Sequence, residues 1–206
     1  TIYAQSGVSM ARLANFAAEH GLTGLEFAQG IPGTVGGGIY MNAGAYGGEM
    51  CQVVEFVTAW LPGQGICTLT AQEMEFSYRH SRFSGGDGVV LSAVFRLQKG
   101  DPEQIKVLME DLIARRKAKQ PLEYPSAGST FKRPEGYFAG KLIEDAGLKG
   151  FTVGGAQVSE KHAGFVINRG GATAADLVEL RNQVHDKVYA EFGVHLEPEV
   201  RFVGEF

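Results

Sequence analysis

The chain has 206 residues, 44% of them hydrophobic and 20% charged, a balance typical of a globular protein with one large domain or two small ones. A net charge of -4 argues against nucleic-acid binding. The one basic run, at 115–119, is equally well explained as the solvated end of a helix. Cys51 and Cys67 have no partners at metal-binding spacing, so both are expected to be reduced, and no apolar stretch is long enough to cross a membrane.

The first third of the chain begins with strand-like residues, so a segment before Thr1 is expected to be missing. A helix is predicted over 9–20, with Ser9 as its N-cap and Gly21 just after its end. One face of that helix carries Leu13, Phe16, Ala17 and His20.

Beyond this helix, β-branched and aromatic residues predict strands at 53–61 and 89–97, and residues 63–65 are expected to form a turn. A boundary is predicted at 99–102, where Asp101 as N-cap and Pro102 begin a helix that runs to about Lys119. Its apolar stripe is Ile105, Leu108, Met109, Leu112 and Ile113.

The last part of the chain predicts a short helix over 137–146 closed by Gly147, a strand-rich piece over 151–168, and a final strand over 196–203. Between the last two lies a long helix with Thr173 and Asp176 in a capping box. Its buried face is expected to be Leu177, Leu180, Val184, Val188 and Phe192. The fold class is therefore α+β in two pieces, 1–99 and 100–206.

Four segments carry candidate chemistry. The glycine-rich stretch 30–38, with 41–47 after it, offers bare backbone N–H groups that suit a phosphate or a flavin edge, although a tight packing turn explains it nearly as well. It is neither a Walker A loop nor a Rossmann fingerprint. In 78–83 an arginine between aromatic residues can bind a carboxylate or lie over a ring, although a surface arginine is commoner.

The other two segments lie in the second half. In 125–134 small residues surround Ser129, so its hydroxyl can approach a ligand closely, although an ordinary turn serine is the simpler reading. No GxSxG motif marks it as a hydrolase nucleophile. In 196–202, alternation in a strand places Glu199 on the side opposite Leu196 and Val200, which is ordinary for an exposed glutamate.

In this order, the segments resemble the UDP-N-acetylenolpyruvoylglucosamine reductase family, also called UDP-N-acetylmuramate dehydrogenases. The resemblance covers the whole chain through the motifs GLxGLEFxxGIPGTVGG, MNAGAYG, YRxSxF, SAGSxFKxP, the stretch 142–168 and LEPEVRFVG. It implies part of an FAD-binding domain of the vanillyl-alcohol-oxidase-like (PCMH) type over 1–99, followed by an α+β substrate-binding domain over 100–206. It also implies FAD, NADPH as reductant, UDP-N-acetylglucosamine-enolpyruvate as substrate, and a cytoplasmic setting without nucleic-acid, membrane or metal partners.

The resemblance also implies roles for individual residues. Arg79 matches the catalytic arginine that steadies the substrate carboxylate as it gains charge, Ser129 the proton donor, and Glu199 a second acid. Substrate contacts are implied for Tyr78, Lys119, Arg133 and His162; a half-buried structural histidine explains His162 equally well, and Arg133 replaces an asparagine frequent in relatives. The cofactor is expected at Gly30, Ile31, Pro32, Gly33, Thr34, Gly36, Gly37 and Asn42.

Two departures from the family pattern leave alternatives open. The upstream glycine-rich segment that ends in a GGGSN-type loop is absent, so a non-catalytic UDP-sugar-binding fragment is the second hypothesis. The short connection after the strand ending at Leu97 leaves no room for a tyrosine-bearing loop over the substrate, which predicts the loop-lacking subtype. A related flavin oxidase is the third hypothesis; Ser129, Lys119 and Glu199 together disfavour it, because such an oxidase needs no proton donor.

Overall fold

The computed structural model describes residues 1–204. The chain divides into two compact units, 1–116 and 117–206, each with its own hydrophobic core. The first unit therefore extends beyond the predicted boundary after residue 99. The reason is that helix α3 (Pro102–Lys119) buries Ile105 and Met109 in the core of the first unit.

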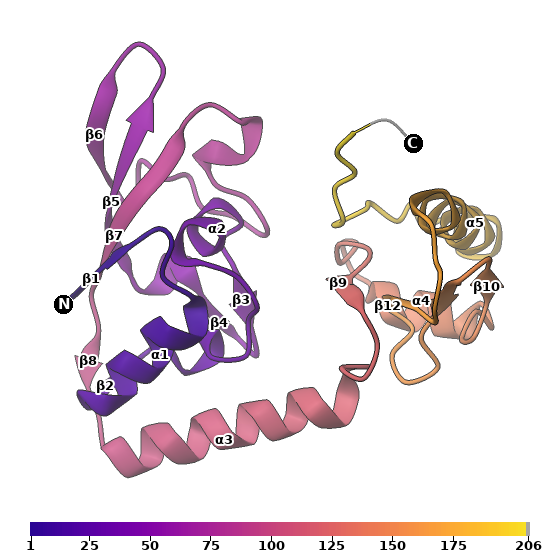
Figure 1. The fold of residues 1–206 in the computed structure, drawn as a ribbon, viewed down its shortest axis with the longest axis horizontal. Coiled ribbons are helices and arrows are strands. Elements are labelled where there is room, and N and C mark those ends of the chain that lie inside the picture. The colour runs from indigo at the N-terminus through magenta and orange to yellow at the C-terminus, as the bar shows by residue number, and fades with distance from the viewer. Residues whose placement is uncertain (205–206) are drawn as a thin grey trace. The chain divides into compact units, whose positions relative to one another are not determined.

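The centre of unit 1 is a four-stranded antiparallel sheet in the order β1-β7-β5-β6 (Figure 1). The predicted strands at 53–61 and 89–97 are confirmed as neighbours in it, and Gly63 and Gly65 form the predicted turn with φ values of 74° and 75°. The four strands are β1 (Ile2–Gln5), β5 (Val54–Leu61), β6 (Gly65–Thr70) and β7 (Val89–Phe95).

Short elements complete unit 1 and shape its loops. Two small antiparallel pairs join β2 to β8 and β3 to β4. Because β2 lies just after the first helix and β8 just before α3, their pairing draws those two helices to one end of the unit. The short elements are β2 (Leu22–Thr23), β3 (Gly44–Ala45), β4 (Gly48–Glu49), β8 (Gln98–Lys99), α2 (Val35–Tyr40) and the 3₁₀ turns Glu26–Ala28, Met50–Gln52 and Arg82–Gly85.

Helix α1 (Met10–Glu19) begins and ends as predicted. The Ser9 hydroxyl accepts a hydrogen bond from the Arg12 N–H at 3.2 Å, and Gly21 has a φ of 63°, the left-handed conformation expected after a helix end. On the face that carries the four named residues, Leu13 and Ala17 are buried, whereas Phe16 is 46% exposed and packs on the exposed His20, with ring centroids 4.2 Å apart.

Helix α3 begins at Pro102 as predicted, and the Asp101 carboxylate accepts a hydrogen bond from the Glu103 N–H at 3.0 Å. Its predicted apolar stripe is only partly buried: Ile105 and Met109 are in the core, whereas Leu108 is 45% exposed. Within the described residues no helix has the length and apolarity needed to cross a membrane. Both cysteines are free thiols, as expected.

Unit 2 has a four-stranded antiparallel sheet in the order β10-β11-β12-β9, with two helices. Helix α4 falls within the predicted 137–146 and is followed by Gly147 at a φ of 68°. The elements are β9 (Ser126–Ser129), α4 (Ala139–Asp145), β10 (Thr152–Val153), β11 (Ala156–Val158), β12 (Phe165–Asn168) and α5 (Ala174–Phe192).

The start of α5 confirms the predicted capping box. The Thr173 hydroxyl accepts from the Asp176 N–H at 3.1 Å, and the Asp176 carboxylate accepts from the Thr173 N–H at 2.9 Å. Leu180, Val184 and Val188 are buried as expected, whereas Phe192, at the end of the helix, is 36% exposed.

The predicted final strand over 196–203 is wrong. The segment makes only an isolated bridge, between Phe131 and Pro198. A ladder cannot continue there, because Pro198 has no N–H to donate and the N–H groups of Glu199 and Val200 both point to one acceptor, the Thr130 carbonyl.

Candidate functional site

The glycine-rich segment of unit 1 packs tightly against the chain that precedes α1. The N–H groups of Val35 and Gly36 donate to the carbonyls of Val8 and Ser6 at 2.8 and 2.9 Å. The Gly37 N–H donates to the Thr34 hydroxyl at 3.3 Å. These N–H groups, expected to be bare, are therefore used within the protein.

Glycine is still required in this segment, for close approach. A Cβ on Gly36 would lie 2.9 Å from the Ser6 Cβ, and one on Gly38 would lie 2.8 Å from the Met10 sulfur. Gly33 has a φ of 149° and accepts a hydrogen bond at its carbonyl from the Met10 N–H. These close contacts fit the reading of the segment as a packing turn, and its role in cofactor binding stays a prediction.

A surface pocket of about 400 Å³ opens beside this segment. Small residues form much of its wall, and the hydroxyl groups of Ser6 and Thr34 line it together with Tyr40 and Phe83. Such a wall suits part of a flavin nucleotide, because backbone and hydroxyl groups can approach phosphate oxygens closely. The remaining lining residues are Gly7, Gly36, Gly37, Gly88, Val89 and Val90.

The other predicted cofactor residues lie around this segment. The Ile31 N–H donates to the Ala28 carbonyl at 3.1 Å and its side chain packs on the core, while Pro32 is exposed. Asn42 is 1% exposed at a φ of 42°; its amide donates to Glu49 at 3.1 Å and to the Ser77 carbonyl at 3.0 Å. Its oxygen accepts from the Cys51 N–H at 2.9 Å. The side chain of Asn42 therefore ties three loops together.

Arg79 lies at the tip of a tight turn in which Ser77 and His80 exchange backbone hydrogen bonds of 3.2 and 3.1 Å. Its φ of 54° is unusual for a residue with a side chain. The guanidinium lies 5.2 Å from the centre of the Tyr78 ring and donates to the Gly44 carbonyl at 3.4 Å. Asn42, Tyr46 and Glu75 also have positive φ values, and the catalytic role of Arg79 stays a prediction.

Arg116 is a further cation of unit 1, beside Arg79, and no role was predicted for it from the sequence. It lies against the bare backbone of Gly30, where an added Cβ would come 3.2 Å from its guanidinium. Partial burial lowers the pKa of Arg116, opposed by the charge of Tyr46. The signal in the sequence was the second arginine of the basic run at 115–119, which was interpreted as a solvated helix end.

In unit 2 the predicted proton donor, Ser129, is the last residue of β9 and is exposed. The next residue, Thr130, accepts a hydrogen bond at its carbonyl from the Glu199 N–H at 2.9 Å. Lys132 continues the pairing by donating its N–H to the Glu197 carbonyl at 2.8 Å. Two of the three predicted catalytic residues, Ser129 and Glu199, thus lie on adjacent, hydrogen-bonded segments, and Arg79 belongs to unit 1.

His162 is half-buried and lies edge-on to Phe165. Its Nδ1 accepts a hydrogen bond from the Gly164 N–H at 3.1 Å, so the neutral ring carries its proton on Nε2. Burial lowers the pKa of His162, and the charges of Lys149 and Lys119 lower it further, whereas a backbone hydrogen bond and the charge of Glu144 raise it.

Arg133, the remaining predicted substrate contact, is exposed and packs its guanidinium 3.9 Å from the centre of the Phe138 ring. Its Nε donates to the Tyr137 carbonyl at 3.2 Å. Across residues 1–204, no three His, Cys, Asp or Glu side chains gather closely enough to hold a metal ion.

Comparison with known proteins defines the class of each unit. Residues 1–70 match the FAD binding domain family, and residues 120–203 match the family described as UDP-N-acetylenolpyruvoylglucosamine reductase, C-terminal domain. The chain is thus part of a flavin-dependent oxidoreductase: an FAD-binding domain followed by an α+β domain, as predicted.

Individual relatives identify the family. Over 204 residues the chain is 56% identical to UDP-N-acetylenolpyruvoylglucosamine reductase of Caldanaerobacter subterraneus subsp. tengcongensis, and the match covers 99% of this chain and 68% of the relative. The protein of the same name from Limosilactobacillus reuteri subsp. reuteri is 55% identical over 203 residues, 98% of this chain and 68% of that protein.

A solved structure agrees. The crystal structure of UDP-N-acetylenolpyruvylglucosamine reductase from Thermus caldophilus superposes with a TM-score of 0.85 at 37% identity, covering 96% of this chain and 71% of that one. The chain therefore belongs to the UDP-N-acetylenolpyruvoylglucosamine reductase family, which confirms the resemblance seen in its motifs.

Proposed function

We propose that this chain supplies the substrate-reducing part of an enzyme that converts UDP-N-acetylglucosamine-enolpyruvate to UDP-N-acetylmuramate. NADPH is the reductant, FAD carries the electrons, and the step serves peptidoglycan precursor synthesis in the cytoplasm. The observation that carries the proposal is the match of both units, in chain order, to the two domains of one reductase family, at 56% identity over nearly the whole chain.

FAD, when bound, would supply the hydride that the β-carbon of the enolpyruvyl group receives, with NADPH as its source. The pocket beside the glycine-rich segment is the proposed contact with FAD in unit 1, because Gly37, which has open space around it, and Thr34 line the pocket. Gly30, Gly33 and Gly36 are proposed as further residues of the cofactor site. Asn42 holds the adjacent loops in place through its three hydrogen bonds.

Arg79 is proposed to bind the substrate carboxylate. Addition of hydride to the β-carbon moves the electron pair of the double bond to the α-carbon and its carboxylate, so negative charge grows there. A guanidinium stabilises that charge best when it is already in place before the reaction. The tight turn at 77–80 and the neighbouring ring of Tyr78 hold Arg79 in this way.

Ser129 is proposed to give its hydroxyl proton to the α-carbon, which completes the reduction. Its exposed position at the end of β9 leaves the hydroxyl available to a substrate. Glu199, held on the adjacent segment, is proposed to act as the second acid near the carboxylate. Lys119 and His162 are proposed to contact the diphosphate, because a cation and a ring N–H donor suit phosphate oxygens. Arg133 is proposed as a further contact with the substrate.

The test is turnover by the FAD-loaded holoenzyme mixed with NADPH and UDP-N-acetylglucosamine-enolpyruvate. The expected result is NADPH oxidation stimulated by the sugar, with a product two mass units heavier than the substrate. NADPH oxidation that ignores the sugar would contradict the proposal.

The roles of single residues require the two half-reactions to be measured separately. In Ser129→Ala, flavin reduction by NADPH should keep its rate, while reoxidation by the sugar should slow by about 100-fold, the loss typical of a missing general acid. Equal slowing of both half-reactions would contradict the role of Ser129 as proton donor.

A further inference from the structure

The strand that ends at Ser129 contains a β-bulge. Phe165 of β12 pairs with Ser129, but Ile167, two residues further along β12, pairs with Ser126, three residues back along β9. One extra residue of β9 is therefore inserted, and Gly128 accommodates it at a φ of 89°. A bulge redirects the side chains that follow it, so the conformation of this insertion determines where the Ser129 hydroxyl points.

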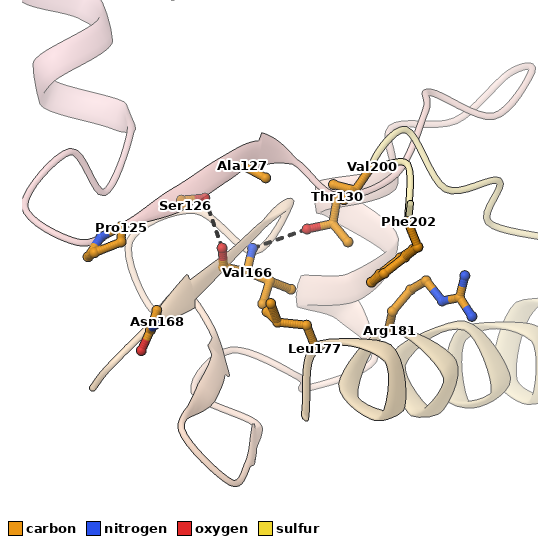
Figure 2. A pocket seen from close by; sticks show the side chains of 10 residues that line it. All are labelled: Pro125, Ser126, Ala127, Thr130, Val166, Asn168, Leu177, Arg181, Val200 and Phe202. Atoms are coloured by element: carbon orange, nitrogen blue, oxygen red, sulfur yellow. Dashed lines mark hydrogen bonds between the residues drawn. The ribbon is translucent and has the colours of Figure 1, made fainter. Parts of the chain in front are cut away.

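Val166 of β12 pairs with Val158 of β11, but on the β9 side it lies at the register shift, where two hydroxyl groups bind its backbone. The Thr130 hydroxyl accepts a hydrogen bond from the Val166 N–H at 3.2 Å. The Ser126 hydroxyl donates to the Val166 carbonyl at 2.8 Å. Figure 2 shows both hydrogen bonds. In the sequence, Ser126 lies three residues before Ser129 and Thr130 lies directly after it.

Thr130 also joins this bulge to the segment that carries Glu199. Its N–H donates to the Gly164 carbonyl at 2.9 Å, and its own carbonyl accepts from the Glu199 N–H at 2.9 Å. The residue is 7% exposed, so water cannot readily replace these bonds. Every polar group of Thr130 therefore contributes to the relative placement of Ser129 and Glu199.

The bulge also forms part of the wall of a pocket. A pocket of about 400 Å³ lies beneath it, with Ser126, Ala127, Thr130 and Val166 in its wall (Figure 2). The hydrogen bonds of the Ser126 and Thr130 hydroxyl groups to Val166 are specific contacts that constrain the conformation of the bulge.

We propose that Ser126 and Thr130 are positioning residues that hold the Ser129 hydroxyl and Glu199 in the geometry needed to protonate the substrate. The inference rests on the proposed function and deepens it. Neither residue exchanges a proton with the substrate: their hydroxyl groups bind Val166, and Ser129 and Glu199 act on the substrate.

The principal test compares Thr130→Val, which keeps the shape of the side chain and removes the acceptor, with Thr130→Ser, which keeps the hydroxyl. In Thr130→Val, reoxidation of the reduced holoenzyme by UDP-N-acetylglucosamine-enolpyruvate should slow by about tenfold or more, as expected when a reacting group is displaced. Flavin reduction by NADPH and the KM for the sugar should stay unchanged. Thr130→Ser should restore reoxidation to within about twofold of the wild type.

Hydrogen exchange provides a readout that does not depend on turnover. The amide of Val166 should exchange with D₂O faster in Thr130→Val than in Thr130→Ser, because only the first variant leaves that N–H without its acceptor. Thr152→Val is the matched control: it makes the same substitution at a threonine of unit 2 whose hydroxyl donates to the Gly150 carbonyl at 2.8 Å. Both half-reactions should be unchanged in it.

The outcomes separate this inference from the proposed function. A wild-type holoenzyme that the sugar does not reoxidise contradicts the function itself. A wild type that turns over normally, with Thr130→Val slowed equally in both half-reactions or with Thr130→Ser as slow as Thr130→Val, contradicts only the positioning role. If Thr130→Val fails to fold, the test uses Ser126→Ala, at the exposed end of the bulge. Selective slowing of flavin reoxidation in this variant supports the positioning role, and an unchanged rate overturns it.

Discussion

Gly36 donates its N–H to the carbonyl oxygen of Ser6 at 2.9 Å, and a Cβ at position 36 would lie 2.9 Å from the Ser6 Cβ. The next residue, Gly37, lies in the same short helix but has open space around it, its nearest neighbour being the Thr34 hydroxyl at 3.7 Å. Neither glycine has a positive φ, so the two differ in steric room and not in backbone strain.

This difference predicts opposite effects of alanine. Gly36→Ala should lower the free energy of unfolding by about 1–3 kcal/mol, the usual cost of overpacking. Gly37→Ala should raise it by about 0.5–1 kcal/mol, because alanine restricts the unfolded chain and favours the helix. Urea unfolding of the two variants without added FAD is the measurement. Equal effects would show that Ser6 yields to the new methyl group.

Replacement of the buried Asn42 is expected to cause a large loss of stability. Asn42→Ala removes three hydrogen bonds from a buried site and should lower the free energy of unfolding by at least about 2 kcal/mol. Asn42→Gly removes the same bonds but relieves the φ of 42°, so it should be more stable than Asn42→Ala by about 1 kcal/mol. Thermal unfolding of both variants is the measurement. If Asn42→Ala were as stable as Asn42→Gly, the positive φ at position 42 would not strain the alanine variant.

Local signals in the sequence were sufficient for most helices and long strands. Ser9 and Thr173 each have a hydroxyl at the right distance from a free N–H, and such caps depend only on neighbouring residues. The strand β9 was missed because its four residues are small and carry no apolar alternation. The last strand was expected from alternation alone, which does not reveal that Glu199 and Val200 share one acceptor.

The candidate site was less predictable from residue patterns, because its contacts join distant parts of the chain. Family resemblance indicated Ser129 and Glu199, but their adjacency through Thr130 requires coordinates. Arg116 illustrates the same limit: its contact with Gly30 crosses most of unit 1, and no local pattern records it.

The lowered pKa of His162 predicts that the free energy of unfolding depends on pH. Burial lowers its pKa below the ordinary value of about 6.5, so between that value and the folded pKa the unfolded chain binds more protons than the native protein. Stability therefore rises with pH in this window. The contribution is complete above about pH 6.5 and is lost as the pH falls through the folded pKa.

Replacement of His162 by glutamine removes this titration. The difference in unfolding free energy between wild type and His162→Gln should shift in favour of the variant as the pH falls from about 7.5 to about 5. Urea unfolding at several pH values is the measurement. Curves that stay parallel over this range would mean that His162 titrates alike in the folded and unfolded chains.

Arg79 and Arg82 form a matched pair for testing the role of charge. Arg79 lies within the turn at 77–80 and Arg82 lies two residues after it, and each donates to a backbone carbonyl, Arg79 to that of Gly44 at 3.4 Å and Arg82 to that of Glu73 at 3.3 Å. Only Arg79 has a positive φ and an adjacent aromatic ring under its guanidinium. If that geometry serves the substrate carboxylate, loss of charge should affect turnover at position 79 and not at position 82.

Arg79→Gln should therefore lower kcat for sugar reduction by about 100-fold or more, the loss typical when a group that stabilises transition-state charge is removed. Arg79→Lys should recover only part of the rate, because a point charge cannot replace the planar two-point contact of a guanidinium with a carboxylate. Arg82→Gln should retain wild-type turnover. Steady-state kinetics of the three variants, with flavin reduction by NADPH measured separately, test the role. If kcat falls as much in Arg82→Gln as in Arg79→Gln, the effect would come from the stability of the loop that carries both arginines. The reason is that only Arg79 is proposed to contact the substrate.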